Sequence, residues 1–68
     1  MEIFSKRLRE LRKDKKLSIR QLSDITNISK STISSYERGQ YQVSIDNIKT
    51  LCKFFGVSSD YLIGLNDF

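Results

Sequence analysis

The segment LSIRQLSDITNISKSTISSYERG, residues 17–39, contains the pattern that decides the fold. An apolar residue precedes a serine, and a second apolar residue follows that serine four positions later. The pattern occurs here twice, as Leu17-Ser18 with Leu22 and as Ile28-Ser29 with Ile33. Serine is a favoured N-cap because its hydroxyl accepts a hydrogen bond from a free amide of the first turn, while the two apolar residues pack together. The segment therefore predicts two helices, residues 18–26 and 29–38, connected by a short turn.

Two further copies of this pattern predict two more helices downstream. They are Val43-Ser44 with Ile48 and Val57-Ser58 with Leu62. The corresponding helices are predicted over residues 44–55 and 58–63. A first helix, residues 3–15, is predicted from the helical spacing of Phe4, Leu8 and Leu11.

Helix ends are marked as clearly as helix starts. Gly39, Gly56 and Gly64 follow three of the predicted helices, at positions where a left-handed residue ends a helix. Asn27 can adopt the same conformation after residues 18–26. Because no long linker separates the segments, we predict an all-α fold, a compact five-helix domain that spans residues 1–68.

The predicted core consists of apolar residues in the helical stripes and beside the N-caps. These residues are Leu8, Leu11, Leu17, Leu22, Ile28, Ile33, Ile45, Ile48, Leu51, Cys52, Phe55, Val57 and Leu62. We interpret the single cysteine, Cys52, as core filler, because no nearby base is expected to activate it.

The composition excludes several classes of protein. No apolar run approaches the roughly 18 residues of a membrane span, and the charged residues 1–16 do not resemble a signal peptide, so we expect no membrane association and a cytoplasmic location. A lone cysteine fits a reducing compartment. Histidine is absent, which removes the usual metal ligand and general base, so we expect no enzymatic activity, no metal and no cofactor.

The charge balance favours a polyanionic partner. Twelve Lys and Arg residues oppose eight Asp and Glu residues, for a formal net charge of +4. Seven of the twelve basic residues lie within residues 6–16. This run is equally compatible with a solvated helix face and with a phosphate-binding surface.

The predicted helix over residues 29–38 has an outer face suited to DNA. Ile33 and Tyr36 are expected to face inward, which leaves Lys30 and several serines outside. Lysine can bond guanine acceptors, and small hydroxyl side chains permit close approach to a groove floor. The same hydroxyls could instead serve only to keep the helix exterior polar, and these residues alone do not exclude that interpretation.

Four motifs in this order resemble the phage repressor and Cro family, also called XRE-type. They are LSIRQL at 17–22, NISKSTIS at 27–34, YERG at 36–39 and FGVSSDYLIG at 55–64, and the resemblance covers about residues 5–64. The resemblance implies a lambda-repressor-like DNA-binding domain with its helix-turn-helix motif at about residues 18–38. It also implies a homodimer on a palindromic operator, often acting as a repressor.

The resemblance further implies which residues contact DNA. The base-reading positions are Lys30, Ser31, Thr32, Ser34 and Ser35. The backbone-contacting positions are Ser18, Arg20, Gln21, Arg38, Gln40 and Tyr41. Gln21 also completes a capping box with Ser18, which competes with a phosphate contact. Glu37 is implied to be structural.

Three positions depart from the family pattern. Ile19 occupies a position that is often Gln, where it can meet a thymine methyl or pack against the first helix; we favour packing. Thr26 replaces a large aliphatic residue and Ser23 replaces the usual Ala. We expect Ile25 to supply the missing apolar contact through a small rotation of the second helix, which would shift the contact assignments by one position.

The resulting expectation is a transcriptional regulator that binds double-stranded DNA, with no small-molecule ligand. An alternative is a helix-turn-helix module that acts mainly through protein–protein interaction with an antitoxin or anti-repressor partner. That alternative draws on the tail at residues 65–68, where Leu65 and Phe68 are apolar.

Overall fold

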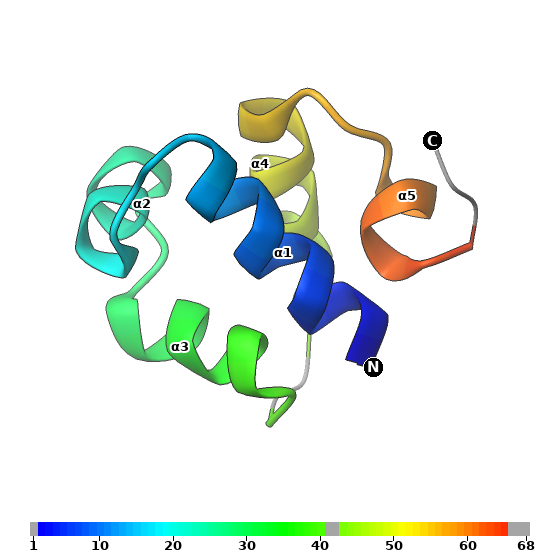
Figure 1. The fold of residues 1–68 in the computed structure, drawn as a ribbon, viewed down its shortest axis with the longest axis horizontal. Helices are drawn as coiled ribbons and strands as arrows, with labels where there is room; N and C mark the ends of the chain where they lie inside the picture. Colours follow the sequence, from blue (N-terminus) through cyan, green and yellow to red (C-terminus); the bar gives the residue numbers. More distant parts are fainter. Residues whose placement is uncertain (1, 41–42, 66–68) are drawn as a thin grey trace.

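The computed structural model describes residues 2–40 and 43–65, and within them the chain is helical throughout its regular structure. The helices are α1 (Glu2–Asp14), α2 (Ile19–Thr26), α3 (Lys30–Arg38), α4 (Ile45–Phe55) and α5 (Ser59–Ile63) (Figure 1). The prediction of an all-α, five-helix fold is confirmed, and every predicted helix lies within one residue of its observed bounds.

The serine N-caps form as the sequence predicts. The hydroxyls of Ser18, Ser29, Ser44 and Ser58 accept hydrogen bonds from the backbone amides of Gln21, Thr32, Asn47 and Tyr61. Asn27 and the three glycines all adopt the left-handed conformation that ends a helix. A fifth left-handed residue, Lys16 with φ of 57°, was not predicted. It follows α1, where the amide of Leu17 bonds the carbonyl of Arg12 at 3.1 Å.

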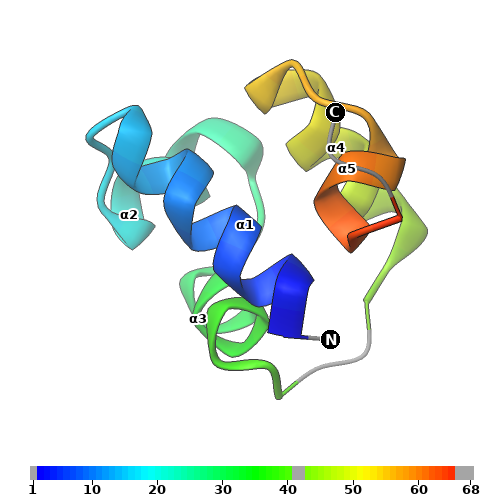
Figure 2. The same ribbon diagram turned by 45° about the vertical axis from the view of Figure 1, so that its right-hand side comes forward.

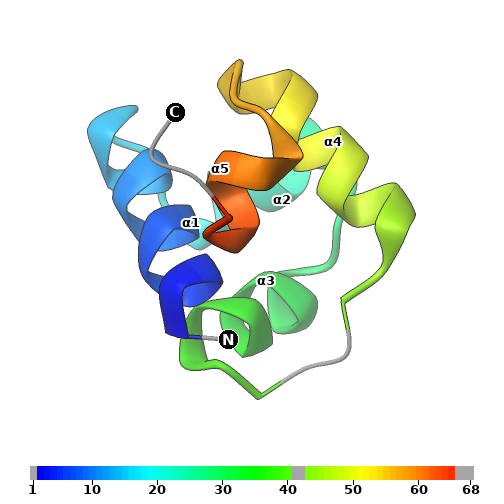
Figure 3. The same cartoon turned by 90° about the vertical axis from the view of Figure 1, so that its right-hand side faces the viewer.

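Helix α1 occupies the centre of the bundle. It packs against α3 and α5, while α2 packs against α3 and α4, and α4 packs against α5. Figures 2 and 3 show α4 and α5 side by side, with α3 at the lower edge of the molecule. The core that these contacts enclose contains Phe4, Leu8, Leu22, Ile28, Ile33, Tyr36, Leu51 and Leu62.

Most of the predicted core residues are buried or packed against this core; Val57 is half-buried outside that set, and Ile45 is exposed. Its side chain is 74% exposed. The apolar pair that flanks the Ser44 cap is Val43 and Ile48, and both pack against the core. Ile45 precedes the buried Leu51 by six residues, which places the two side chains about 120° apart around the helix axis. The prediction that Ile45 lies in the core is therefore wrong.

The described residues contain no helix that is both long and apolar enough to cross a lipid bilayer.

Candidate nucleic-acid interface

The turn between α2 and α3 fixes how these two helices meet. Asn27 ends α2 in the left-handed conformation, with φ of 61° and ψ of 21°. Ile28 is 5% exposed and anchors the turn in the core, and Ser29 then caps α3. Three residues thus reverse the chain and leave the first turn of α3 at the surface, which is the arrangement of a helix-turn-helix.

Helix α3 is held to the rest of the molecule through Tyr36. Its ring packs edge-on against Phe4, with the ring centroids 5.5 Å apart. Its carbonyl accepts a hydrogen bond from the hydroxyl of Ser5 at 2.5 Å. Its own hydroxyl accepts a hydrogen bond from the Asn47 side-chain amide at 2.9 Å. One tyrosine therefore ties α3 to both α1 and α4.

A bidentate ion pair makes a second link between α1 and α3. Arg12 Nε lies 2.7 Å from Glu37 Oε2, and Arg12 Nη2 lies 2.9 Å from Glu37 Oε1. The same guanidinium donates to the carbonyl of Leu17 at 2.8 Å, so it also holds the connection to α2. The side-chain hydrogen bond to Glu37 raises the pKa of Arg12 above its usual value, so this cation remains charged.

The expected structural role of Glu37 agrees with this contact, but its partner was missed. In the sequence, Arg12 is one of seven basic residues in a run and has no feature that separates it from its neighbours. The helical spacing gives the only available signal, because Arg12 follows the buried Leu8 by four residues and so shares its face of α1.

The outer face of α3 contains the predicted base-reading residues. Lys30 and Ser31 are exposed, and Thr32, Ser34 and Ser35 are half-buried. The Ser29 hydroxyl organises the first turn, since it donates to the Thr32 hydroxyl at 2.7 Å and lies 3.2 Å from that of Ser31. Because Thr32 accepts that bond, its own hydroxyl hydrogen remains available to a partner.

The beginning of α2 carries three predicted backbone contacts. The Ser18 hydroxyl accepts from the Gln21 amide at 3.0 Å, and the Gln21 side-chain oxygen accepts from the Ser18 amide at 2.8 Å. The predicted capping box is therefore confirmed, and it leaves the side-chain nitrogen of Gln21 able to donate outward. Arg20 is exposed beside it, whereas Ile19 packs against the core, as favoured from the sequence.

The remaining predicted contacts follow α3. Arg38 and Gln40 are both exposed, and the Gln40 amide bonds the Ser35 carbonyl at 3.0 Å across the left-handed Gly39. Tyr41 lies outside the described residues. Figure 1 shows the first turns of α2 and α3 on the same side of the molecule, and the segment after α3 at the opposite end of that helix.

The expected compensation for Thr26 does not occur. Ile25 is 54% exposed and supplies no core contact. The Thr26 hydroxyl instead donates to the Leu22 carbonyl at 2.7 Å and lies 3.4 Å from the Ile28 amide, which gives the polar side chain local partners. The interpretation of Ile25 as a substitute apolar contact is wrong, and with it the reason for shifting the contact assignments.

Comparison with known proteins places these features in a wider context. Residues 8–62 match the family described as helix-turn-helix. The uncharacterized HTH-type transcriptional regulator YobD of Bacillus subtilis (strain 168) is 37% identical over 65 residues, covering 96% of this chain and 58% of that protein. The cryptic phage CTXphi transcriptional repressor RstR of Vibrio cholerae is 29% identical over 55 residues, which cover 81% of this chain and 50% of that protein. Another relative is a transcriptional activator.

A solved structure shares the fold. The restriction-modification controller protein C.AhdI from Aeromonas hydrophila matches with a TM-score of 0.80 and 36% identity, covering 90% of this chain and 92% of that one. By contrast, this chain spans only about half the length of the curated relatives just described. The matched proteins are regulators, not enzymes, in agreement with the expectation from the sequence.

Proposed function

This chain belongs to the helix-turn-helix family of XRE type, and on that basis we propose that it regulates transcription by binding double-stranded DNA in a sequence-specific manner. The observation that carries the proposal is the two-sided character of α3. Ile33, Tyr36 and Glu37 hold its inner side in the molecule, while its outer side carries small hydroxyl residues between Lys30 at its start and Arg38 at its end.

This outer side suits the major groove. A groove about 12 Å wide admits a helix, and short side chains allow the helix axis to approach the base edges. Lys30, exposed at the first position of α3, can donate to guanine N7 and O6. Ser31 and Thr32 lie in the same turn, and Ser34 and Ser35 continue the face in the next one.

The flanking segments supply phosphate contacts. The first turn of α2 combines free backbone amides with the positive end of the helix dipole, and exposed Arg20 adds a full charge. Arg38 and Gln40, at the other end of α3, offer donors to the opposite strand. Phosphate contacts of this kind set the orientation of α3 and do not themselves read sequence.

We also propose a homodimer that acts as a repressor on a palindromic operator, with half-sites about 34 Å apart, one turn of the duplex. A two-fold protein matches a two-fold site, and one small domain offers few base contacts by itself. The relationship to a phage transcriptional repressor supports this direction of control, although an activator also occurs among the relatives.

Selection from a random duplex pool tests DNA recognition. The purified chain is incubated with the pool at physiological salt, and the bound fraction is sequenced. We expect enrichment of a palindrome. Lys30→Ala should then reduce the preference for the selected sequence over a scrambled duplex, because one base contact contributes about 1–3 kcal/mol of discrimination. An unenriched pool would refute the proposal.

Lys6→Ala is the matched control, since Lys6 is an exposed lysine on α1 and the charge change is identical. It should preserve the preference. Repression is tested separately with a reporter gene placed behind the selected operator. Expression of the chain should lower the reporter signal, and a rise in signal would identify an activator instead.

A further inference from the structure

Three neighbouring hydroxyls at the start of α3 form a short hydrogen-bonded chain, the hydroxyl relay of Ser29, Ser31 and Thr32. The Ser29 hydroxyl accepts a hydrogen bond from the Thr32 amide at 3.2 Å and donates to the Thr32 hydroxyl oxygen at 2.7 Å. The Ser31 hydroxyl oxygen lies 3.2 Å from that of Ser29. Within residues 2–40 and 43–65 these three side chains make no other hydrogen bond.

The direction of each bond in the relay follows from the number of hydrogens. A hydroxyl has one hydrogen and two lone pairs, so a serine or threonine can ordinarily either donate to a base or accept from it. Ser29 uses its single hydrogen on Thr32, so Ser31 is the donor in the contact between Ser31 and Ser29. The Ser29 hydroxyl is therefore saturated, with one bond donated and two accepted, and it has no capacity left for a base.

The other two hydroxyls consequently differ in polarity. Ser31 directs its hydrogen to Ser29 and keeps only lone pairs for a partner. Thr32 accepts from Ser29 and keeps its hydrogen, which needs an acceptor once a partner excludes water from it. A relay of this kind removes the ambiguity that a hydroxyl normally has as a reader of base edges.

The relay lies where a DNA partner would meet it. Ser31 is exposed, Thr32 is half-buried, and exposed Lys30 precedes them as the first residue of α3. Residues at the N-terminal end of a recognition helix are the ones that meet base edges in the major groove. A lysine ammonium only donates. The first turn of α3 therefore presents a donor, an acceptor and a donor at residues 30, 31 and 32.

We propose that Ser29 is a positioning residue that sets the base preference of the DNA interface without contacting a base. The duplex presents an amino group, adenine N6 or cytosine N4, to Ser31, and a carbonyl oxygen, guanine O6 or thymine O4, to Thr32. This inference rests on the proposed function and narrows it, because the two hydroxyls alone would accept either class of base edge.

Ser29→Asp reverses one bond of the relay and keeps the helix cap. Aspartate is as good an N-cap as serine, but its carboxylate only accepts hydrogen bonds. It still accepts from the Thr32 amide, and the Thr32 hydroxyl now donates to it. Thr32 then presents lone pairs to DNA, whereas Ser31 donates to the cap residue as before. The substitution thus changes the polarity of one hydroxyl and leaves the other unchanged.

Parallel selections from a random duplex pool compare the unaltered chain with Ser29→Asp. Guanine O6 and adenine N6 occupy the same place on a purine, as thymine O4 and cytosine N4 do on a pyrimidine. We therefore expect guanine to become adenine, or thymine to become cytosine, at the position that Thr32 contacts, with about tenfold preference each way. The added charge weakens phosphate contacts with every duplex alike, so it does not change the selected sequence. Selection of the same sequence by both chains overturns the proposal.

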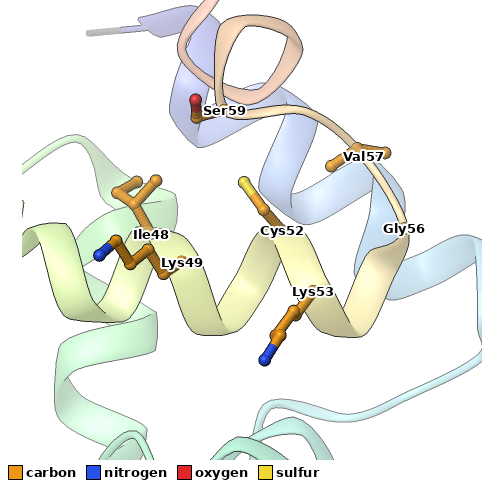
Figure 4. A pocket seen from close by; sticks show the side chains of 7 residues that line it. All are labelled: Ile48, Lys49, Cys52, Lys53, Gly56, Val57 and Ser59. Carbon is orange, nitrogen blue, oxygen red and sulfur yellow. The ribbon is translucent and has the colours of Figure 1, made fainter.

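Two hydroxyl deletions identify the positions involved. Thr32→Val and Ser31→Ala should each lose about tenfold preference, at different base pairs. In the Thr32→Val background, Ser29→Asp should no longer change the preferred base, and a change there overturns the relay. Ser59→Ala is the matched control, since Ser59 is an exposed serine in the first turn of α5 that lines a cavity against α4 (Figure 4). It should preserve every preference.

A titration without DNA tests the relay independently of the proposed function. In Ser29→Asp the introduced carboxylate accepts from both the amide and the hydroxyl of Thr32, and hydrogen bonds to the charged form lower the pKa of a carboxyl group. Adding Thr32→Val removes the hydroxyl bond, so the pKa of the introduced carboxyl should rise. NMR titration measures the pKa in both variants. Equal pKa values overturn the relay.

The two proposals fail in different ways. An unenriched pool for the unaltered chain overturns DNA recognition and the base assignments with it. An enriched sequence that Ser29→Asp leaves unaffected overturns the role of Ser29 and keeps DNA recognition intact. Ser29→Thr retains both the cap and the hydroxyl hydrogen, so it should select the unaltered sequence, and a different sequence would overturn the proposal. Circular dichroism on each variant verifies that the helices are retained.

Discussion

Replacing Arg12 with methionine removes the guanidinium that joins α1, the α2 connection and α3. The pair is well enclosed, since the side chains of Arg12 and Glu37 are 12% and 7% exposed. Removing one partner of a buried pair leaves the other charge without compensation, which costs about 3–5 kcal/mol. Because Arg12 retains some access to solvent, we expect Glu37→Leu to lower the free energy of unfolding by about 3 kcal/mol, and Arg12→Met to lower it by a similar amount.

The double variant distinguishes the energy of the Arg12–Glu37 interaction from the other effects of the two substitutions. Arg12→Met with Glu37→Leu removes both charges and keeps apolar volume, and such replacements are often close to neutral. The Leu17 carbonyl still loses its donor, which costs about 1 kcal/mol. We therefore expect the double variant to be destabilised by about 1 kcal/mol, far less than the summed losses of the single variants.

Urea unfolding followed by circular dichroism measures these free energies, and thermal melts offer a second readout. At about 4–8 °C per kcal/mol for a chain of this size, each single variant should melt roughly 12–24 °C lower. Arg9→Met is the matched control, because exposed Arg9 makes only a 3.4 Å contact with the Glu37 carbonyl. Arg9→Met should lower the free energy of unfolding by less than about 0.5 kcal/mol. Additive losses in the double variant would refute the coupling between Arg12 and Glu37.

Three further predictions concern single positions. Gly64→Ala should destabilise the chain more than Gly56→Ala in urea unfolding, since its Cβ would lie 2.7 Å from Ile3 Cγ2 whereas Gly56 faces open space; equal losses would contradict this. Lys16→Gly should stabilise the chain by about 1 kcal/mol, because φ of 57° strains a residue with a Cβ, and a lower urea midpoint would argue against that strain. Burial raises the pKa of the Cys52 thiol, so its alkylation at pH 8 should be slower than that of free cysteine and should reach the free rate in urea; equal rates in buffer would show an accessible thiolate.

The helix boundaries could be predicted because they depend on neighbours in the chain. Ser29 caps α3 through an amide three residues away, and Gly39 ends it without any distant contact. The same holds for the capping box of Ser18 and Gln21, which the sequence predicts and the structure contains. Local chemistry of this kind is fully visible in a single sequence.

The features that could not be predicted depend on distant residues. The pairing of Arg12 with Glu37 spans 25 residues, and nothing local distinguishes Arg12 within its basic run. Of the candidate interface, the positions on α3 follow from helical spacing, but their contacts with DNA remain predictions, because no partner determines which hydroxyl reaches which base.

The structure also explains how α3 can be both rigid and adaptable. Its anchoring residues contact α1 and α4, whereas Ser31 makes its recorded side-chain contact only within its own turn. Substitution at Ser31 therefore has little effect on packing, and surface changes of this kind usually alter stability by less than about 0.5 kcal/mol. A change of base contact alters discrimination by about 1–3 kcal/mol. Because the change in discrimination between bases exceeds the change in stability, the outer face of α3 can acquire a new sequence preference while Tyr36 and Glu37 keep the helix in place.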